Sequence, residues 1–108
     1  MVTDETLRLA TDRLVEQFRP QRVILFGSQA RGTADARSDV DLLVICPVPA
    51  GPGSRRALMV AMDRALRGVE IATDFVILTP EEFERDRQIP GTVARPAWRE
   101  GKVLYEAP

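Results

Sequence analysis

Short runs of apolar residues constrain the fold of this chain more than any other feature of its sequence. Arg22 to Phe26 (RVILF) is nearly continuous in apolar side chains, and Val40 to Ile45 is a second such run. A strand with one wet face alternates between apolar and polar residues, so a continuous run is typical of a strand covered on both faces. A third strand is predicted over Ile71 to Leu78. The sequence therefore predicts a sheet that is covered by helices.

Four helices are predicted from apolar residues at helical spacing, over Thr3 to Phe18, Arg55 to Leu66, the segment after Thr79, and Gly91 to Gly101. The clearest start signal is Thr79-Pro80-Glu81-Glu82, with a threonine N-cap, a proline at the first helical position and a glutamate placed for a capping box. The last helix is predicted to be weak, because Pro96 removes a backbone donor inside it. Arg55 and Arg56 are expected to be solvated, with a role in holding a nucleotide or RNA as the alternative.

The order of these elements defines the fold class. It reads helix, strand, strand, helix, strand, helix, helix and a last short strand over Val103 to Tyr105. We predict an α/β (α+β) fold, a small mixed β-sheet flanked by helices. No internal repeat or long linker divides the sequence, so residues 1–108 are expected to form a single domain.

Composition excludes several classes of function. The 15 basic and 16 acidic residues give a net charge of −1, so nucleic acid is not expected as a direct ligand. No apolar run approaches the length of a membrane span, and the acidic N-terminus does not resemble a signal peptide, so we expect a cytoplasmic protein. The chain has no histidine, which excludes Ser-His-Asp chemistry and an ordinary zinc site. Any metal must be bound by oxygen, which favours magnesium, manganese or calcium.

The first candidate site is Asp39-Val40-Asp41 at the head of the second predicted strand. Because side chains alternate along a strand, Asp39 and Asp41 project to one face and Val40 to the other. Two carboxylates side by side repel by about 1 kcal/mol at 4 Å in water, and a divalent cation turns that repulsion into coordination. The alternative is a pair of solvated acids at the entrance of a strand.

The second candidate site is Gly27-Ser28, directly after the first predicted strand. A glycine lets the backbone approach a ligand closely, and the following turn can direct N–H groups and the Ser28 hydroxyl toward a phosphate. The alternative is an ordinary strand-to-helix turn with Ser28 as its N-cap. The segment is not a P-loop, because Gly27 to Gly32 is not followed by Lys and Ser or Thr. If the two strands are neighbours, the turn and the carboxylate pair lie at the same edge of one sheet.

Together these motifs resemble a known family. Phe26-Gly27-Ser28, ten intervening residues and then Asp39-Val40-Asp41-Leu42 resemble the signature of the DNA polymerase β–type nucleotidyltransferase superfamily. The fuller string GSQARGTADARSDVDLLV resembles its smallest branch, the minimal nucleotidyltransferases, and so does the tail that begins at Asp74. Pro96 departs from the continuous helix expected there. In prokaryotes, members of this branch are typically paired with a HEPN-domain partner as toxin–antitoxin modules.

The resemblance implies two-metal nucleotidyl transfer. Asp39 and Asp41 would bridge two Mg²⁺ ions, with Mn²⁺ as a substitute, and Asp74 would complete the ion that activates the attacking hydroxyl. The alternative for Asp74 is a salt bridge to an arginine, because an acid among apolar residues of a strand is costly unless it is paired or metal-bound. Ser28 and the turn amides would hold the β and γ phosphates. Arg31 would either neutralise phosphate charge or pair with a local acid.

The resemblance also implies a partner. Larger members of the superfamily add a helical domain that closes over the nucleotide or acceptor, so we expect a shallow pocket here or one completed by a second subunit in a hetero-oligomer. We predict an antitoxin that transfers AMP from ATP to a protein hydroxyl, on a tyrosine of its HEPN toxin partner. The alternatives are a non-catalytic interaction module that neutralises its partner by binding, and a nucleotide sensor.

Overall fold

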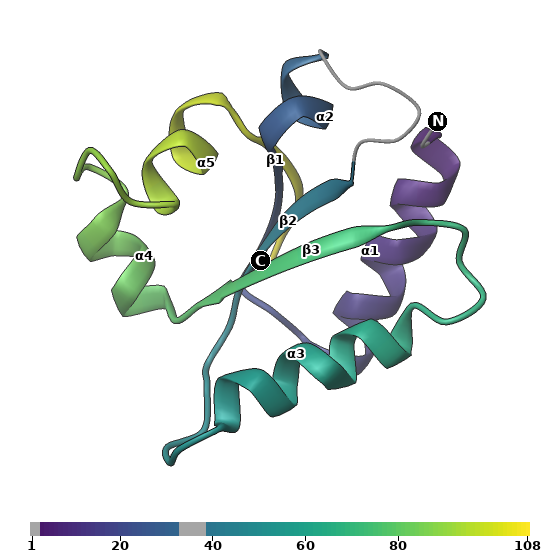
Figure 1. Cartoon of the computed structure of the whole chain (residues 1–108), viewed down its shortest axis with the longest axis horizontal. Coiled ribbons are helices and arrows are strands. Elements are labelled where there is room, and N and C mark those ends of the chain that lie inside the picture. Colours follow the sequence, from purple (N-terminus) through teal and green to yellow (C-terminus); the bar gives the residue numbers. More distant parts are fainter. Residues whose placement is uncertain (1–2, 33–38) are drawn as a thin grey trace.

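The computed structural model describes residues 3–32 and 39–108, which form one sheet with helices on both faces (Figure 1). The elements in chain order are α1 (Asp4–Phe18), β1 (Arg22–Phe26), α2 (Gly27–Arg31), β2 (Val40–Ile45), α3 (Ser54–Ala65), β3 (Thr73–Leu78), α4 (Pro80–Asp86), α5 (Ala94–Glu100) and β4 (Lys102–Glu106). The predicted mixed α/β architecture is confirmed. Residues 33–38, the second half of the polar stretch before β2, lie outside the described residues.

The sheet has the strand order β3-β2-β1-β4. β1 pairs in an antiparallel direction with both β2 and β4, whereas β2 and β3 run parallel. The sheet is therefore mixed, as predicted, with β3 and β4 at its two edges.

Two apolar layers enclose the sheet. On one face the β2 side chains Val40, Leu42 and Val44 pack with residues of α1 and α3. On the other face Leu43 and Ile45 pack with residues of α4 and α5. Both sets of β2 side chains are buried, which explains why the run was apolar without alternation. The prediction of a strand covered on both faces is confirmed.

The helix ends follow the local signals. Thr79 accepts a hydrogen bond from the Glu82 amide at 3.1 Å, and the Glu82 carboxylate accepts one from the Thr79 amide at 2.8 Å, so the predicted capping box is present. Pro96 lies in the first turn of α5, where a helical amide has no partner within the helix. It therefore costs this helix less than predicted.

The structure differs from the sequence prediction at two elements. β3 begins at Thr73 rather than Ile71, and Ile71 packs against the core from the segment before the strand. The short α2 was not predicted as an element of its own. It holds five residues with no apolar stripe and packs against β1, β2 and α5. No helix in the described part of the chain has both the length and the apolar character to cross a membrane.

Candidate active site

The motif residues lie at one end of the sheet. β1 ends where the antiparallel β2 begins, so that Phe26 lies opposite Asp41. β3 runs parallel to β2 and starts at the same end, with Asp74 in register beside Asp41. The two motif-bearing strands are therefore neighbours, and the turn after β1 lies at the same end of the sheet as the acids (Figure 1).

Asp41 lies among other charged side chains, and they change its pKa. Residues in register on neighbouring strands carry their side chains on the same face, so Asp41 and Asp74 are adjacent. Partial burial raises the pKa of Asp41, the negative charges of Asp74 and Asp39 raise it further, and the positive charge of Arg31 lowers it. Three acids and one arginine thus act on one another here, with an excess of negative charge.

Gly27 makes room for Asp41. Its φ of 72° lies in the left-handed region, which favours glycine. A Cβ added at this position would collide with Oδ2 of Asp41 and lie 3.1 Å from its Cγ. We interpreted the glycine from sequence as a point of close approach to a ligand. The structure adds that the space beside its Cα holds the Asp41 carboxylate.

Ser28 is half-buried in the first turn of α2, and it is not the N-cap of that helix. The N-cap is Phe26, and no side chain caps the helix. The first amides of a helix have no intrahelical partners and favour anions, so α2 begins with N–H groups suited to a phosphate. The Ser28 hydroxyl belongs to the same turn.

Arg31 is the last residue of α2 and is exposed. Its charge acts on Asp41, yet within residues 3–32 and 39–108 it forms no ion pair with a carboxylate. Of the two predicted roles, pairing with a local acid therefore finds no partner in that part of the chain. A cation on α2 can contribute to binding a triphosphate.

Asp39, Asp41 and Asp74 do not act as a preformed three-residue metal site. In the part of the chain that the structure describes, no three acidic or cysteine side chains lie close enough together to hold a metal ion. Magnesium does not require such a site, because it is usually bound by one or two carboxylates, with the remaining ligands from water and substrate phosphates. Asp41 and Asp74 are adjacent on parallel strands, and Asp39 is close enough for its charge to act on Asp41. The adjacent pair of carboxylates fits a hard divalent cation that takes its remaining ligands from water and a nucleotide.

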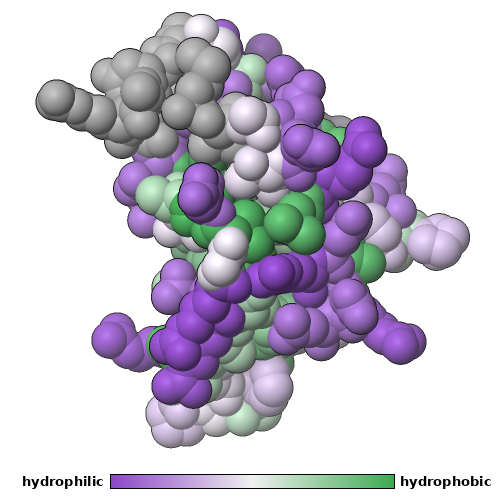
Figure 2. Space-filling view, turned by 90° about the vertical axis from the view of Figure 1, so that its right-hand side faces the viewer, coloured by the Kyte–Doolittle hydropathy of each residue, from purple (hydrophilic) through white to green (hydrophobic). Residues whose placement is uncertain are grey.

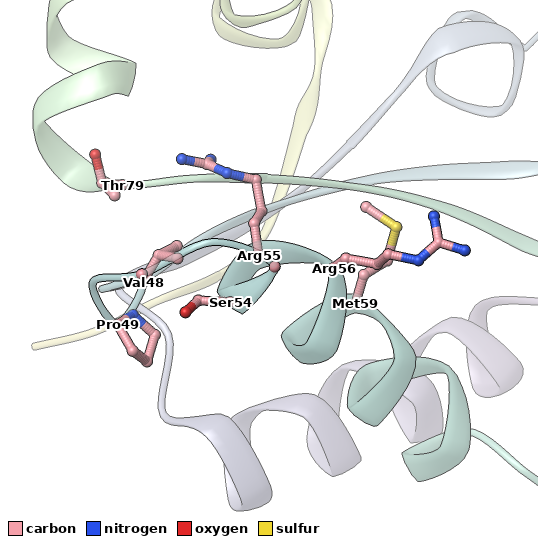
Figure 3. Close-up of a pocket in the computed structure, with 9 residues that line it drawn as sticks. Val48, Pro49, Ser54, Arg55, Arg56, Met59 and Thr79 are labelled. Atoms are coloured by element: carbon pink, nitrogen blue, oxygen red, sulfur yellow. The ribbon is translucent and has the colours of Figure 1, made fainter.

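A hollow lies at the opposite end of the sheet, where β2 and β3 end and α3 begins (Figure 3). It measures about 580 Å³ and includes Ser54, Arg56 and Met59 in its lining. Figure 3 shows Arg55 extending toward Thr79, while Arg56 points away from it. The Arg55 side chain is 41% exposed, as the expectation of a solvated residue allows, but it also has partners that the sequence did not predict. Its guanidinium donates to both carboxylate oxygens of Glu82, at 2.9 and 3.0 Å, and to the Ile77 carbonyl.

A smaller hollow of about 280 Å³ adjoins Asp74. Its lining comes from α3 and from the first residues of β3: Met59, Val60, Asp63, Thr73, Asp74 and Phe75. Figure 2 looks onto the end of the molecule where β3 begins, and apolar residues are exposed there among hydrophilic ones. The sequence did not predict this hollow, because residues of α3 and β3 meet only in the folded chain.

Comparison with protein families gives one match that covers most of the chain. A family model described as the nucleotidyltransferase domain matches residues 7–104. A sequence comparison with curated proteins finds no significant match.

Solved structures share the fold. A Sulfolobus solfataricus protein provisionally named a nucleotidyltransferase superposes with a TM-score of 0.63 at 19% identity, covering 94% of this chain and 78% of that one. A chain of a toxin–antitoxin complex with AMP-PNP gives 0.61 at 22% identity, covering 94% and 73%. A chain of the complex between the tri-AMPylated Shewanella oneidensis HEPN toxin and its MNT antitoxin gives 0.54 at 20% identity, covering 93% and 72%. At these identities the likeness establishes the fold.

Proposed function

We propose that this chain, which belongs to the nucleotidyltransferase domain family, is a protein adenylyltransferase that acts as an antitoxin by transferring AMP from ATP to a hydroxyl of a HEPN toxin. The acceptor would be a tyrosine. Because ATP is the donor, the reaction would take place in the cytoplasm. The observation that carries the proposal is the adjacency of Asp41 and Asp74 on parallel strands, beside the glycine turn that opens α2. The carboxylates of Asp41 and Asp74 would bind the metal ion, and the first turn of α2 would bind the triphosphate beside it.

The names of the structural neighbours support the choice of partner. One complex of this fold contains a nucleotide analogue, and another contains an AMPylated HEPN toxin bound to its antitoxin. We expect the same arrangement for this chain. A partner subunit would complete the pocket in a hetero-oligomer.

The proposed transfer balances as a single displacement. The acceptor hydroxyl oxygen attacks the α-phosphorus of ATP, a new P–O bond forms, the bond from that phosphorus to the bridging oxygen breaks, and pyrophosphate leaves. The hydroxyl proton passes to the Asp74 carboxylate and from there to solvent. Ser28 and the first amides of α2 bind the β and γ phosphates, and Arg31 offsets their charge. Divalent ions held by Asp39, Asp41 and Asp74, two Mg²⁺ in this proposal, would neutralise charge on the triphosphate and on the acceptor oxygen.

The test is transfer of label to a purified HEPN-domain toxin as the partner. ATP labelled at the α-phosphate should label the partner in the presence of Mg²⁺, and ATP labelled at the γ-phosphate should not. Calorimetry with Mg²⁺ and ATP should lose its signal in Asp39→Asn. Asp12→Asn, an exposed acid on α1, is the matched control and should bind normally.

Two outcomes would replace the proposal. A partner that is neutralised in the cell equally well by the Asp39→Asn chain would identify a non-catalytic antitoxin that acts by binding. ATP binding without any transfer, with the partner present, would identify a nucleotide sensor.

A further inference from the structure

The outer edge of β3 has backbone groups without partners. β3 is an edge strand, and its hydrogen bonds to β2 use alternate residues, as the bonds from the Val40 amide to the Ala72 carbonyl and from the Cys46 amide to the Leu78 carbonyl show. The backbone groups of Thr73 and Phe75 therefore point away from β2. Within residues 3–32 and 39–108 they have no hydrogen-bond partner. In Figure 1 no described helix or strand lies in front of this edge.

One end of this edge is blocked and the other is open. The Arg55 guanidinium donates to the Ile77 carbonyl, and the same side chain is fixed by its two bonds to Glu82. The Ile77 carbonyl, which points outward near the end of β3, therefore has a hydrogen-bond partner. The outward backbone groups of Thr73 and Phe75, near the start of β3, have none among the described residues. Edge strands are commonly protected against pairing, so a part that lacks such protection is a place where another strand can add.

The open part of the edge adjoins the proposed reaction centre. Asp74 lies between Thr73 and Phe75, with its side chain on the face that carries Asp41. On an added strand, the residue in register with Asp74 would carry its side chain on that same face, about 4.5–5.5 Å away between Cβ atoms. A hydroxyl at that position would lie beside the carboxylate that is proposed to take up its proton.

The hollow of about 280 Å³ lies along the same stretch of edge. Its apolar side chains come from Met59, Val60 and Phe75, and Val60 is 44% exposed. It lies on the side of β3 that α3 covers, so it would receive an apolar side chain next to the hydroxyl residue on an added strand. Asp63 at its lining, together with the acids of the site, favours a basic residue nearby.

We propose that the acceptor protein docks by adding an extended segment to the free edge of β3, with its hydroxyl residue in register with Asp74 and a neighbouring apolar side chain in the hollow beside Met59 and Val60. This inference rests on the proposed function, because it identifies the docking mode of the protein acceptor. It goes beyond that function by assigning an edge, a register and a side-chain pocket to the acceptor.

The experiment compares two surface variants in the complex with the HEPN-domain partner. Val60→Arg places a charge at the hollow, and Val103→Arg makes the same change on the opposite edge strand β4, where Val103 is 55% exposed. Val60→Arg should weaken partner binding and AMP transfer by at least about tenfold, while Mg²⁺-dependent ATP binding stays unchanged. Val103→Arg should alter neither. Equal effects of the two variants would overturn the docking mode.

A second measurement reads the backbone directly. The Phe75 amide should exchange with solvent quickly in the free chain and at least about tenfold more slowly in the complex, as followed by NMR. Unchanged exchange in a complex that forms would overturn the proposal. Protection that grows with the concentration of the chain alone would assign the edge to a second copy instead. Protection in the complex without any AMP transfer would leave the docking intact and reject the proposed function.

Discussion

The two ends of the β2–β3 pair handle charge in opposite ways. At the end where these strands finish, which we call the capped end, Glu82 accepts hydrogen bonds from Arg55 and from the Thr79 amide, and these bonds lower the pKa of Glu82. At the end where they begin, the acidic end, burial and neighbouring acids raise the pKa of Asp41. Among the described residues, an ion pair compensates the charge of Glu82 at the capped end, whereas like charges repel one another at the acidic end.

The way each end handles charge distinguishes a structural region from a functional one better than the volume of its hollow does. A hollow of about 580 Å³ lies at the capped end, beside an ion pair and a capping box that hold α3 and α4 to β3. The hollow beside Asp74 is smaller, about 280 Å³, yet the acidic side chains at that end repel one another. Perturbed ionisable groups cluster where binding or catalysis occurs, because stability alone would select against them.

The largest effect that would test this comparison is on AMP transfer. Asp74→Asn should lower transfer by at least about a hundredfold, or about 2.7 kcal/mol of barrier, because its carboxylate acts as the acceptor hydroxyl ionises. Binding of Mg²⁺ and ATP should remain, and single-turnover labelling of the partner measures the loss. Glu82→Gln at the capped end is the control and should transfer at nearly the wild-type rate. Label at the wild-type rate in Asp74→Asn would make this acid structural.

The next effect concerns Gly27 and nucleotide affinity. Gly27→Ala forces a strained left-handed backbone and pushes a methyl group into the Asp41 carboxylate, so ATP affinity should fall by about tenfold or more. Titration calorimetry with Mg²⁺ and ATP measures it.

Gly32→Ala is a matched control for that change. Gly32 also has a positive φ, of 74°, but a Cβ there would meet no atom within 4 Å among the described residues. It should show a loss of stability from the backbone alone, with affinity nearly unchanged. Equal losses of affinity in both variants would mean that backbone strain, not contact with Asp41, sets the effect.

At the capped end the expected effect is on folding. Glu82→Ala removes both the capping box of α4 and the partner of Arg55, so the free energy of unfolding should fall by about 1–2 kcal/mol. Urea denaturation measures it. Glu81→Ala in the same helical turn keeps the capping box and the partner of Arg55, so it should lower the free energy of unfolding by only a few tenths of that amount. A cost no larger than that of Glu81→Ala would remove the contrast between the two ends.

The strands and their faces could be predicted from sequence because the signal is local. The bounds of β1 and β2 follow from continuous apolar runs, and the burial of β2 on both faces follows from the lack of alternation. The helix α2 could not be predicted, because packing against the sheet and α5, rather than any apolar stripe of its own, forms it.

Contacts between distant segments were the other limit. The register of Asp41 with Asp74 depends on a parallel pairing that forms only after the crossover through α3, so Asp74 could be assigned only through the family resemblance. The same reason explains why the ion pair of Arg55 was not predicted, since its partner Glu82 lies on another helix 27 positions along the chain. Charge pairs of this kind leave no periodic pattern in a sequence.

The smallest effect is on the pH dependence of stability, and its sign differs between the two ends. Folding raises the pKa of Asp41, so the native chain loses stability as pH rises through that pKa, and Asp41→Asn should melt higher at neutral pH in metal-free buffer. The gain should be at most a few degrees, since about 1 kcal/mol shifts the Tm of a domain of this size by roughly 4–8 °C. This gain should vanish in acid, where Asp41 is protonated in both states.

Folding lowers the pKa of Glu82, so the contribution of Glu82 to stability is present above the ordinary pKa of a glutamate and is lost as pH falls through the lowered value. Thermal melts of Asp41→Asn and Glu82→Gln between acid and neutral pH should therefore diverge in opposite directions from the wild type. Parallel curves would show that the acidic end carries no excess charge to be relieved by a ligand.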